Sequence, residues 1–393
     1  MLLKNAFIYI DGSFKSSDLY IINETEWIIG EDLSSIKCDQ IIDLSKKYIV
    51  PGLVDVHVHL REPGFEYKET ILTGSESAKA GGFTSICAMP NVTPSPDDID
   101  NIRLIQDIVD KDACINVYQY SCITEGRLGQ NLVDVSKLKD FVIGFSDDGN
   151  PVSSDLIMKK MIEQSAMHDV LIAAHCEDFS YEDPRMSEYM NIKRDIELLK
   201  NTDTSCRYHV CHVSSKKSIE LIRQAKKDGI SVTCETAPHY LVFTKEDVIS
   251  ENFKMNPPLG DKEDKEALIQ AVCDGTIDII ATDHAPHTYE DKLAGAMGVI
   301  GMETSFSSMY TYLVKTGIIK LENLIELMSV NPSYIFRIPR YSDFTVLDLD
   351  TEYAVKSDGF LSLGRNTPFE GMTLNGRVIK TICKGKIVWE YTQ

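Results

Sequence analysis

Apolar and polar residues alternate strictly along the stretch from Val54 to Arg61. Successive side chains of a β-strand point to opposite faces, so this pattern predicts a strand with one apolar and one polar face. The apolar face would carry Val54, Val56, Val58 and Leu60, and the polar face Asp55, His57, His59 and Arg61. Buried histidines are costly without a partner, so a histidine pair on a hydrophobic strand indicates a functional site.

Strand-like apolar runs alternate with helical patterns through the middle of the chain. The predicted strands are 48–59, 84–88, 116–120, 141–145, 170–174, 208–213, 231–235 and 277–281. The clearest predicted helices are 68–80, 97–111, 154–167, 214–227 and 262–273, with a short helix at 135–139. Several end at a glycine, the residue that most often follows a helix. The alternation predicts a (β/α)8 TIM barrel. A doubly wound open sheet competes, but no glycine-rich phosphate-binding sequence follows the first strand.

Both ends of the chain predict short strands joined by tight turns. The N-terminal runs are 2–10, which leads to Asp11-Gly12, then 20–22, 26–29 and 40–43. The C-terminal runs are 344–348, 373–378 with a turn at Asn375-Gly376, and 379–389 with a turn at Lys384-Gly385. Neither end alone has enough apolar surface for its own core. We therefore expect an α/β protein with a barrel over 51–339 and a small β-sandwich domain formed by 1–50 together with 340–393.

Composition and charge narrow the class of partner. The chain has 393 residues, of which 43% are hydrophobic and 25% charged, which is typical of a globular protein. A formal net charge of -20 argues against nucleic acid or an anionic membrane, so local positive charge would have to hold an anionic substrate. Ten cysteines without CxxC spacing predict reduced thiols in a cytoplasmic protein. No run approaches the ~20 apolar residues of a membrane span.

The chemically active residue types lie where the predicted strands end, the position of the catalytic groups in a (β/α)8 barrel. They are His57 and His59 at the end of the first strand, one of the pair Asp147 and Asp148 after the fourth, His175 at the end of the fifth, His212 at the end of the sixth and Asp283 at the end of the eighth, which makes six. Imidazole and carboxylate ligands suit zinc or a similar divalent ion. Six ligands exceed the four of a structural zinc, so two ions sharing a carboxylate, or one ion using part of the set, are predicted. Arg61 beside them would suit a carboxylate.

Seven segments resemble, in the same order, the motifs of the type I dihydroorotases of the amidohydrolase superfamily. They are residues 56–64, 89–91, 147–149, 174–177, 209–214, 255–259 and 281–287. The resemblance covers nearly the whole chain, including the split β domain. It implies the reversible hydrolysis of (S)-dihydroorotate to N-carbamoyl-L-aspartate, the third step of de novo pyrimidine biosynthesis.

The resemblance also implies roles for individual residues. His57 and His59 would hold one Zn²⁺, His175 and His212 a second, and Asp148 would bridge them, the spacing to His175 favouring Asp148 over Asp147. Asp283 would bind the first ion and transfer the catalytic proton. The implied substrate contacts are His59, Arg61, Asn91, Asn256, His287, Met297 and Gly298. Two positions depart from the family pattern, Gly260 in place of a common arginine and Met297 in place of a frequent aromatic residue.

Two alternatives stay open at this stage. Related hydantoinases, dihydropyrimidinases and allantoinases typically bridge their metals with a carboxylated lysine, whereas Asp147-Asp148-Gly149 stands at that place here. An inactive homologue that acts as a scaffold for aspartate transcarbamoylase is expected to have lost ligands, yet all six are present. A homodimer, and a complex between an active enzyme and that transcarbamoylase, are left open as well.

Five more polar residues lie in or near these motifs. Asp55 is predicted to orient a ligand imidazole through a hydrogen bond. Glu177 either supports a ligand or begins a helix, and His239 lies at the rim after the seventh strand. We interpret His209 as a packing residue, because it is out of phase with His212, and His284 as structural.

Overall fold

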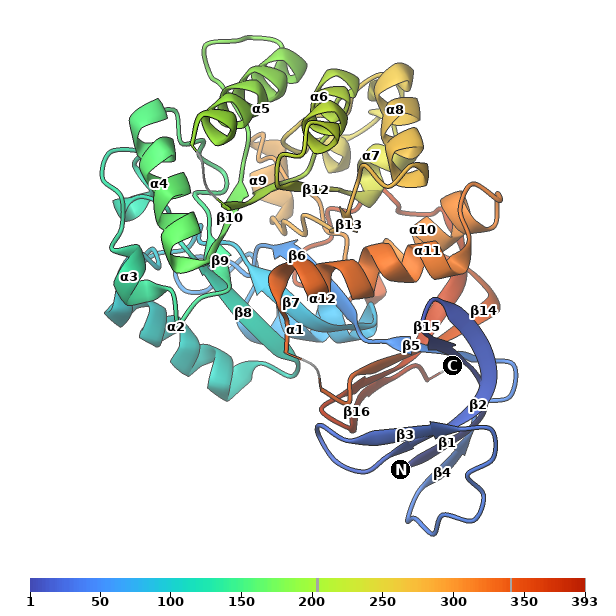
Figure 1. Cartoon of the computed structure of the whole chain (residues 1–393). Coiled ribbons are helices and arrows are strands. Elements are labelled where there is room, and N and C mark those ends of the chain that lie inside the picture. The colour runs from blue at the N-terminus through green and yellow to red at the C-terminus, as the bar shows by residue number, and fades with distance from the viewer. Residues whose placement is uncertain (203–204, 340, 393) are drawn as a thin grey trace.

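The computed structural model describes residues 1–202, 205–339 and 341–392. Two eight-stranded sheets organise the molecule, a parallel barrel sheet surrounded by helices and a smaller sheet built from the two ends of the chain. Figure 1 shows the small sheet beside the barrel, with both termini in it. The predicted fold, a TIM barrel with a small β-sandwich domain, is confirmed.

The elements have the following bounds. The strands are β1 Leu2–Ile10, β2 Ser13–Ile21, β3 Trp27–Gly30, β4 Ile41–Asp43, β5 Tyr48–Pro51, β6 Leu53–Val58, β7 Phe83–Ala88, β8 Asn116–Ser121, β9 Gly144–Phe145, β10 Leu171–Ala174, β11 Arg207–Val210, β12 Val232–Thr236, β13 Ile279–Ile280, β14 Phe344–Ala354, β15 Thr373–Cys383 and β16 Lys386–Glu390. The helices are α1 Ile71–Ala80, α2 Ile99–Asp112, α3 Val135–Leu138, α4 Asp155–His168, α5 Pro184–Asn201, α6 Lys216–Lys227, α7 Pro238–Val242, α8 Lys262–Cys273, α9 Tyr289–Leu293, α10 Ser305–Met309, α11 Leu321–Ile325 and α12 Asn331–Phe336.

The barrel strands β6 to β13 lie side by side in chain order. A parallel bridge between Val58 and His284, beyond the end of β13, closes the ring. Two strands are shorter than the sequence predicts, since β9 spans Gly144–Phe145 and β13 spans Ile279–Ile280. The polar side chains that follow them therefore belong to loops at the barrel rim.

The local sequence explains where the main helices begin and end. Side chains of Asp98, Ser154 and Ser215 accept hydrogen bonds from backbone N–H groups of the first turns of α2, α4 and α6. Gly229 and Gly275, which follow α6 and α8, adopt positive φ angles of 81° and 76°. These caps direct each chain segment back to the next barrel strand.

The terminal sheet has the order β16-β15-β14-β5-β1-β2-β3, and β4 pairs with β1. The prediction of a turn at Asn375-Gly376 is wrong, because β15 runs from Thr373 to Cys383 through both residues. The β14–β15 register shifts between Asp348 and Glu352, opposite this dipeptide, so the positive φ of Gly376 (75°) belongs to a bulge. The predicted turn at Lys384-Gly385 joins β15 to β16.

The first barrel strand is less regular than its alternating sequence predicts. Its six residues Leu53–Val58 are all buried. The β6–β7 register shifts between Asp55 and Val58, and Val54 and Val56 pack in a different apolar cluster from Val58 and Leu60. The expectation of one continuous apolar face is therefore wrong. The irregularity lies at His57, the first histidine of the pair.

All ten cysteines are free and most are buried. In the described residues, no helix combines the length and the apolar character that crossing a membrane requires.

Candidate metal centre

Six side chains that are distant in the sequence meet at the end of the barrel strands. They are His57, His59, Asp148, His175, His212 and Asp283, and all are at most 7% exposed. Two groups of three could each hold a cation, one formed by His57, His59 and Asp148 and the other by Asp148, His175 and His212. The carboxylate of Asp148 belongs to both groups. This is the arrangement that two ions sharing one bridging ligand require.

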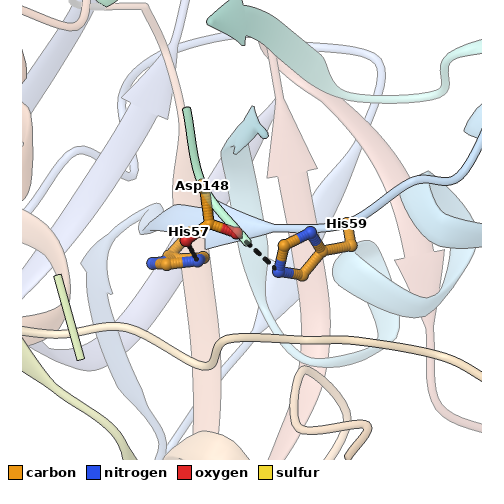
Figure 2. A group of neighbouring side chains, drawn as sticks. All are labelled: His57, His59 and Asp148. Atoms are coloured by element: carbon orange, nitrogen blue, oxygen red, sulfur yellow. Dashed lines mark ion pairs between the residues drawn. The ribbon is translucent and has the colours of Figure 1, made fainter. Parts of the chain in front are cut away.

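Asp148 lies between the two histidine pairs. Its Oδ2 is 3.5 Å from His59 Nε2, and its Oδ1 is 3.4 Å from His57 Nε2. Figure 2 shows the two imidazoles approaching this carboxylate from different sides. The same Oδ1 is 3.4 Å from His175 Nδ1 and 3.6 Å from His212 Nε2. Asp283 completes the first group, with its Oδ1 3.0 Å from His59 Nε2.

The neighbouring aspartate has a different role. Asp147 Oδ1 accepts hydrogen bonds from the backbone N–H groups of Ile123 (2.8 Å) and Thr124 (3.1 Å). Its other oxygen accepts a short hydrogen bond from the Thr124 hydroxyl. Asp147 therefore anchors the loop after β8, and Asp148 alone of the two reaches the histidines.

Three residues of the site have backbone conformations that non-glycine residues rarely adopt. The φ angles are 63° for Arg61, 35° for His212 and 48° for Asp283. Left-handed conformations cost about 1–3 kcal/mol each and persist where the surrounding structure imposes them. These kinks at the ends of strands turn the three side chains into the barrel mouth.

The electrostatics of the site favour a bound cation. Burial lowers the pKa of His57, but the nearby carboxylates of Asp148, Glu235 and Asp283 outweigh it and raise that pKa well above its ordinary value. Two buried atoms, His57 Nε2 and Asp148 Oδ1, have no hydrogen-bond partner among the described residues. His175 Nδ1 and His212 Nε2 lie 2.9 Å apart, so a proton or a cation must separate their lone pairs. The donor set therefore fits divalent metal ions.

Hydrogen bonds at the outer ring nitrogens orient three of the four imidazoles. His57 Nδ1 donates to Glu235 Oε1 (2.6 Å), and His59 Nδ1 donates to Asn91 Oδ1 (2.9 Å). His175 Nε2 donates to Glu177 Oε2 (3.0 Å). Each bond fixes the tautomer and leaves the lone pair of the other nitrogen directed into the site. Glu177 therefore supports the candidate ligand His175, which is one of the two roles predicted for it. Asn91 contacts the candidate ligand His59.

Glu235 was not singled out by the sequence patterns. It is 1% exposed at the end of β12, and its second oxygen accepts a hydrogen bond from His209 Nε2 (3.1 Å). His209 in turn contacts the Thr233 hydroxyl at 2.8 Å. The interpretation of His209 as a packing residue is incomplete, because His209 also donates a hydrogen bond to Glu235, and Glu235 in turn accepts the hydrogen bond from His57. A glutamate that ends a buried strand was the available signal.

Asp55 does not orient an imidazole, contrary to the prediction. Its Oδ1 accepts hydrogen bonds from the backbone N–H groups of His57 (3.2 Å) and Thr282 (3.1 Å), and its Oδ2 accepts one from the Thr282 hydroxyl (2.5 Å). The carboxylate therefore joins the backbone of β6 to the segment that carries Asp283. The register shift in β6 explains why Asp55 reaches backbone groups.

The contact between His57 and Glu235 leads to a testable prediction. A Glu235→Gln variant keeps the shape of the side chain but removes the charge that strengthens the hydrogen bond from His57 Nδ1. We expect its metal affinity to fall about 10- to 100-fold, measured by competition with a chelator. Glu188→Gln is the matched control, because Glu188 is equally buried but bonds to Ser214 and Ser215. Unchanged metal affinity in Glu235→Gln would remove Glu235 from the metal centre.

A positively charged pocket wall lies beside the histidines. Arg61 is 9% exposed, and its Nε donates to the carbonyl of Pro286 (3.4 Å). His287 Nε2, 3.3 Å from Arg61 Nη2, donates to the carbonyl of Met297 (2.8 Å). Lys68 Nζ donates to His287 Nδ1 (3.3 Å). Burial and the charges of Arg61 and Lys68 lower the pKa of His287 to about 3, so this imidazole is neutral.

The remaining substrate-contact candidates lie near His175 or near His287. Asn256 Nδ2 donates to Glu177 Oε2 (3.2 Å), which places it next to His175. Gly298 has a φ of 139°, and a Cβ there would lie 2.7 Å from the Cβ of Ala285, so the loop needs glycine at this position. The Met297 side chain is 47% exposed, and its backbone carbonyl makes the contact with His287.

Two other histidines, His239 and His284, lie close to the site and are not among the candidate ligands. His239 is buried against the ring of Tyr240, its Nε2 has no hydrogen-bond partner among the described residues, and burial lowers its pKa to about 4. His284 accepts a hydrogen bond from the Gly301 N–H at Nδ1 (3.3 Å), and its Nε2 lies 3.4 Å from Glu69. These contacts support the structural interpretation of His284.

Comparisons with known sequences agree with this architecture. A model of the amidohydrolase family matches residues 48–388. A dihydroorotase of Anoxybacillus flavithermus is 43% identical over 394 residues, covering 92% of each chain. One from Geobacillus sp. is 41% identical and covers 99% of both chains, and one from Fusobacterium nucleatum is 40% identical and covers 99% of this chain and 98% of its own.

Comparisons with solved structures give the same fold. An L-hydantoinase (dihydropyrimidinase) from Arthrobacter aurescens superposes with a TM-score of 0.90 at 26% identity, covering 100% of this chain and 96% of its own. A dihydropyrimidinase from Brevibacillus agri has a TM-score of 0.86 at 20% identity, covering 100% of this chain and 95% of its own. At that identity the second likeness shows the fold alone.

Proposed function

The chain belongs to the amidohydrolase family and, within it, to the dihydroorotases, and we propose that it interconverts (S)-dihydroorotate and N-carbamoyl-L-aspartate at the six-residue centre. The observation that carries the proposal is the position of Asp148 between the two histidine pairs, next to the buried guanidinium of Arg61. The position of Asp148 between the histidine pairs suits hydrolysis of a cyclic amide. The buried guanidinium of Arg61 suits a substrate that carries a carboxylate.

We propose two zinc ions for this centre, with His57, His59 and Asp283 at one, His175 and His212 at the other, and Asp148 shared. When bound, such ions lower the pKa of a coordinated water towards ~7 and polarise the carbonyl that is attacked. The outer hydrogen bonds from His57 to Glu235, from His59 to Asn91 and from His175 to Glu177 hold the ligands ready for the ions. A preorganised set of ligands reduces the reorganisation needed during catalysis.

Asp283 is the proposed proton carrier. Burial raises its pKa, but the charges and hydrogen bonds of His57 and His59 outweigh that effect and hold the pKa below its ordinary value. The carboxylate is therefore ionised at neutral pH and can accept a proton from the attacking water. The same oxygen can then return the proton to the ring nitrogen that leaves, so one residue serves as base and then as acid.

Arg61 is the proposed partner of the substrate carboxylate. It forms no ion pair within the described residues, although it is almost fully buried and its pKa is lowered to about 10 by burial. An unpaired buried charge is costly, and a carboxylate from the substrate would compensate it. The guanidinium can also bind both oxygens of a carboxylate at once. His287 would line this site beside Arg61, with Asn91 and Asn256 flanking the ring.

Replacing the arginine tests this assignment. In an Arg61→Met variant we expect KM for dihydroorotate to rise about 100-fold, equivalent to about 2.8 kcal/mol, with a smaller change in kcat. Dihydrouracil, which lacks the carboxylate, should be hydrolysed equally poorly by the wild type and the variant. A KM for dihydroorotate that matches the wild type would remove Arg61 from the carboxylate site.

Hydantoinase-type activity is the competing proposal, because an L-hydantoinase shares the fold. Those relatives typically bridge their metals with a carboxylated lysine, whereas Asp148 stands between the histidines here. The deciding experiment compares kcat/KM of the zinc-loaded protein for dihydroorotate and for hydantoin. We expect dihydroorotate to be preferred by at least ~100-fold, as Arg61 would bind its carboxylate. Preference for hydantoin would overturn the substrate assignment.

The inactive-scaffold alternative is disfavoured because all six ligand candidates are present and meet at one place. A cytoplasmic location, a homodimer and a complex with aspartate transcarbamoylase stay predictions from the sequence.

A further inference from the structure

A buried lysine lies behind the loop that carries the substrate-contact candidates Met297 and Gly298. Lys292, in the short helix α9, is 2% exposed. Its Nζ donates three hydrogen bonds to backbone carbonyls, to Lys254 (2.8 Å), Ala296 (3.0 Å) and Gly298 (2.8 Å). No carboxylate pairs with it among the described residues. Three carbonyl dipoles thus stabilise a buried positive charge, and the ammonium has all three of its protons in use.

The three carbonyls belong to two segments that are far apart in the sequence. Lys254 directly precedes Met255 and Asn256, and Ala296 and Gly298 flank Met297. A backbone hydrogen bond from the Gly298 N–H to the same Lys254 carbonyl (3.0 Å) joins the segments a second time. The ammonium therefore links the segment that carries Asn256 to the loop that carries Met297 and Gly298.

The position of α9 extends this link to the carboxylate site. The helix begins immediately after Thr288, which follows His287, and His287 Nε2 donates to the Met297 carbonyl (2.8 Å). Asn366 Nδ2 donates to the Gly298 carbonyl from the other side (3.0 Å). Both peptide groups next to Met297 are therefore held, one by the ammonium and one by His287.

We propose that Lys292 is a positioning residue for substrate binding. Its ammonium fixes the spacing between the segment 254–256 and the loop 296–298, the two segments that carry the substrate-contact candidates Asn256, Met297 and Gly298. The proposal rests on the proposed dihydroorotase function for its substrate, but the loop geometry that it predicts does not depend on that function. Lys292 touches neither the metal ligands nor the reacting atoms.

A purely structural role for Lys292 would give a different result from a positioning role. Loss of a structural residue lowers the free energy of unfolding and reduces the active fraction, which lowers apparent kcat and leaves KM unchanged. Loss of a residue that positions the pocket wall weakens binding, so KM rises while the metal content is preserved. The two roles are therefore separated by KM, kcat and metal content measured on the same preparation.

The experiment compares Lys292→Met and Lys292→Gln with Lys262→Met. Methionine fills a similar volume without any donor, whereas glutamine retains two N–H donors and should restore part of the function. Lys262→Met is the control, since Lys262 is an exposed lysine of α8 that pairs with Glu266 and has no contact with Lys292 among the described residues. Each protein is loaded with zinc, and its kcat, KM and zinc content are measured. Hydrogen exchange of the free proteins is followed over residues 294–301.

We expect Lys292→Met to raise KM for dihydroorotate at least ~10-fold, with kcat changed less than ~3-fold and zinc content unchanged. Lys292→Gln should lie between this variant and the wild type, and Lys262→Met should match the wild type. Exchange over residues 294–301 should accelerate at least ~10-fold in Lys292→Met without any substrate present.

Equal KM values for the wild type and Lys292→Met would overturn the proposal, as would unchanged exchange over the loop. If Lys292→Met does not fold, Lys292→Gln carries the test by the same two criteria. A wild-type protein that fails to hydrolyse dihydroorotate would contradict the proposed function, and the exchange result would still decide whether Lys292 holds the loop.

Discussion

An Asp148→Ala variant is expected to lose both metal ions and at least ~10³-fold in kcat/KM for dihydroorotate. Asp148 is the one residue that belongs to both ligand groups, and its two oxygens face His59 on one side and His57, His175 and His212 on the other. Without it, His57 and His59 keep only Asp283 beside them, His175 and His212 keep no carboxylate, and no shared anion offsets the repulsion between two dications. Zinc content after dialysis and the rate of dihydroorotate hydrolysis measure the effect.

The neighbouring aspartate provides a matched control for that variant. Asp147→Ala removes hydrogen bonds to the N–H groups of Ile123 and Thr124 and should lower the free energy of unfolding by about 1–3 kcal/mol. Its zinc content should match the wild type, since Asp147 does not reach the histidines. If Asp147→Ala loses zinc and Asp148→Ala retains it, the assignment of the bridge is reversed.

An Asp283→Ala variant is expected to lower kcat about 10³-fold or more, since it removes the group proposed to take up and return the proton. Its zinc content should stay close to that of the wild type, because His57, His59 and Asp148 still form a three-ligand group. Turnover is followed at the ring-opening step, and zinc is measured on the same sample.

The control is Asp110→Ala, which changes an exposed aspartate on α2 that bonds to Gln106. Its kcat should equal that of the wild type. Normal turnover in Asp283→Ala would show that another group carries the proton.

Much of the architecture follows from local sequence patterns. Apolar runs, helix caps and glycines after helices predict the barrel, because each signal acts within a few residues. The six candidate ligands could be chosen for the same reason, since every one of them lies at or within a few residues of the end of a predicted strand. The barrel topology then brings the ends of the strands together. Residues at the ends of different predicted strands are therefore predicted to lie close to one another.

Features that depend on exact register or on distant partners could not be predicted. A register shift within β6 directs Asp55 to the backbone of His57 and Thr282 instead of to a ring. Asn375-Gly376 is a strong turn signal, but pairing with β14 absorbs it in a bulge. Glu235 has a local signal in its place at the end of a buried strand, but its partner His57 is distant in the sequence, and Lys292 joins its own loop to the distant carbonyl of Lys254.

Titration of the metal-free protein with zinc, with dihydroorotate hydrolysis measured at each addition, tests the central claim most directly. The account predicts no hydrolysis without metal and a linear rise to a plateau at two equivalents of zinc per chain, in step with the zinc that the protein retains. Full activity without metal, or a plateau at one equivalent, would contradict a two-ion centre bridged by Asp148.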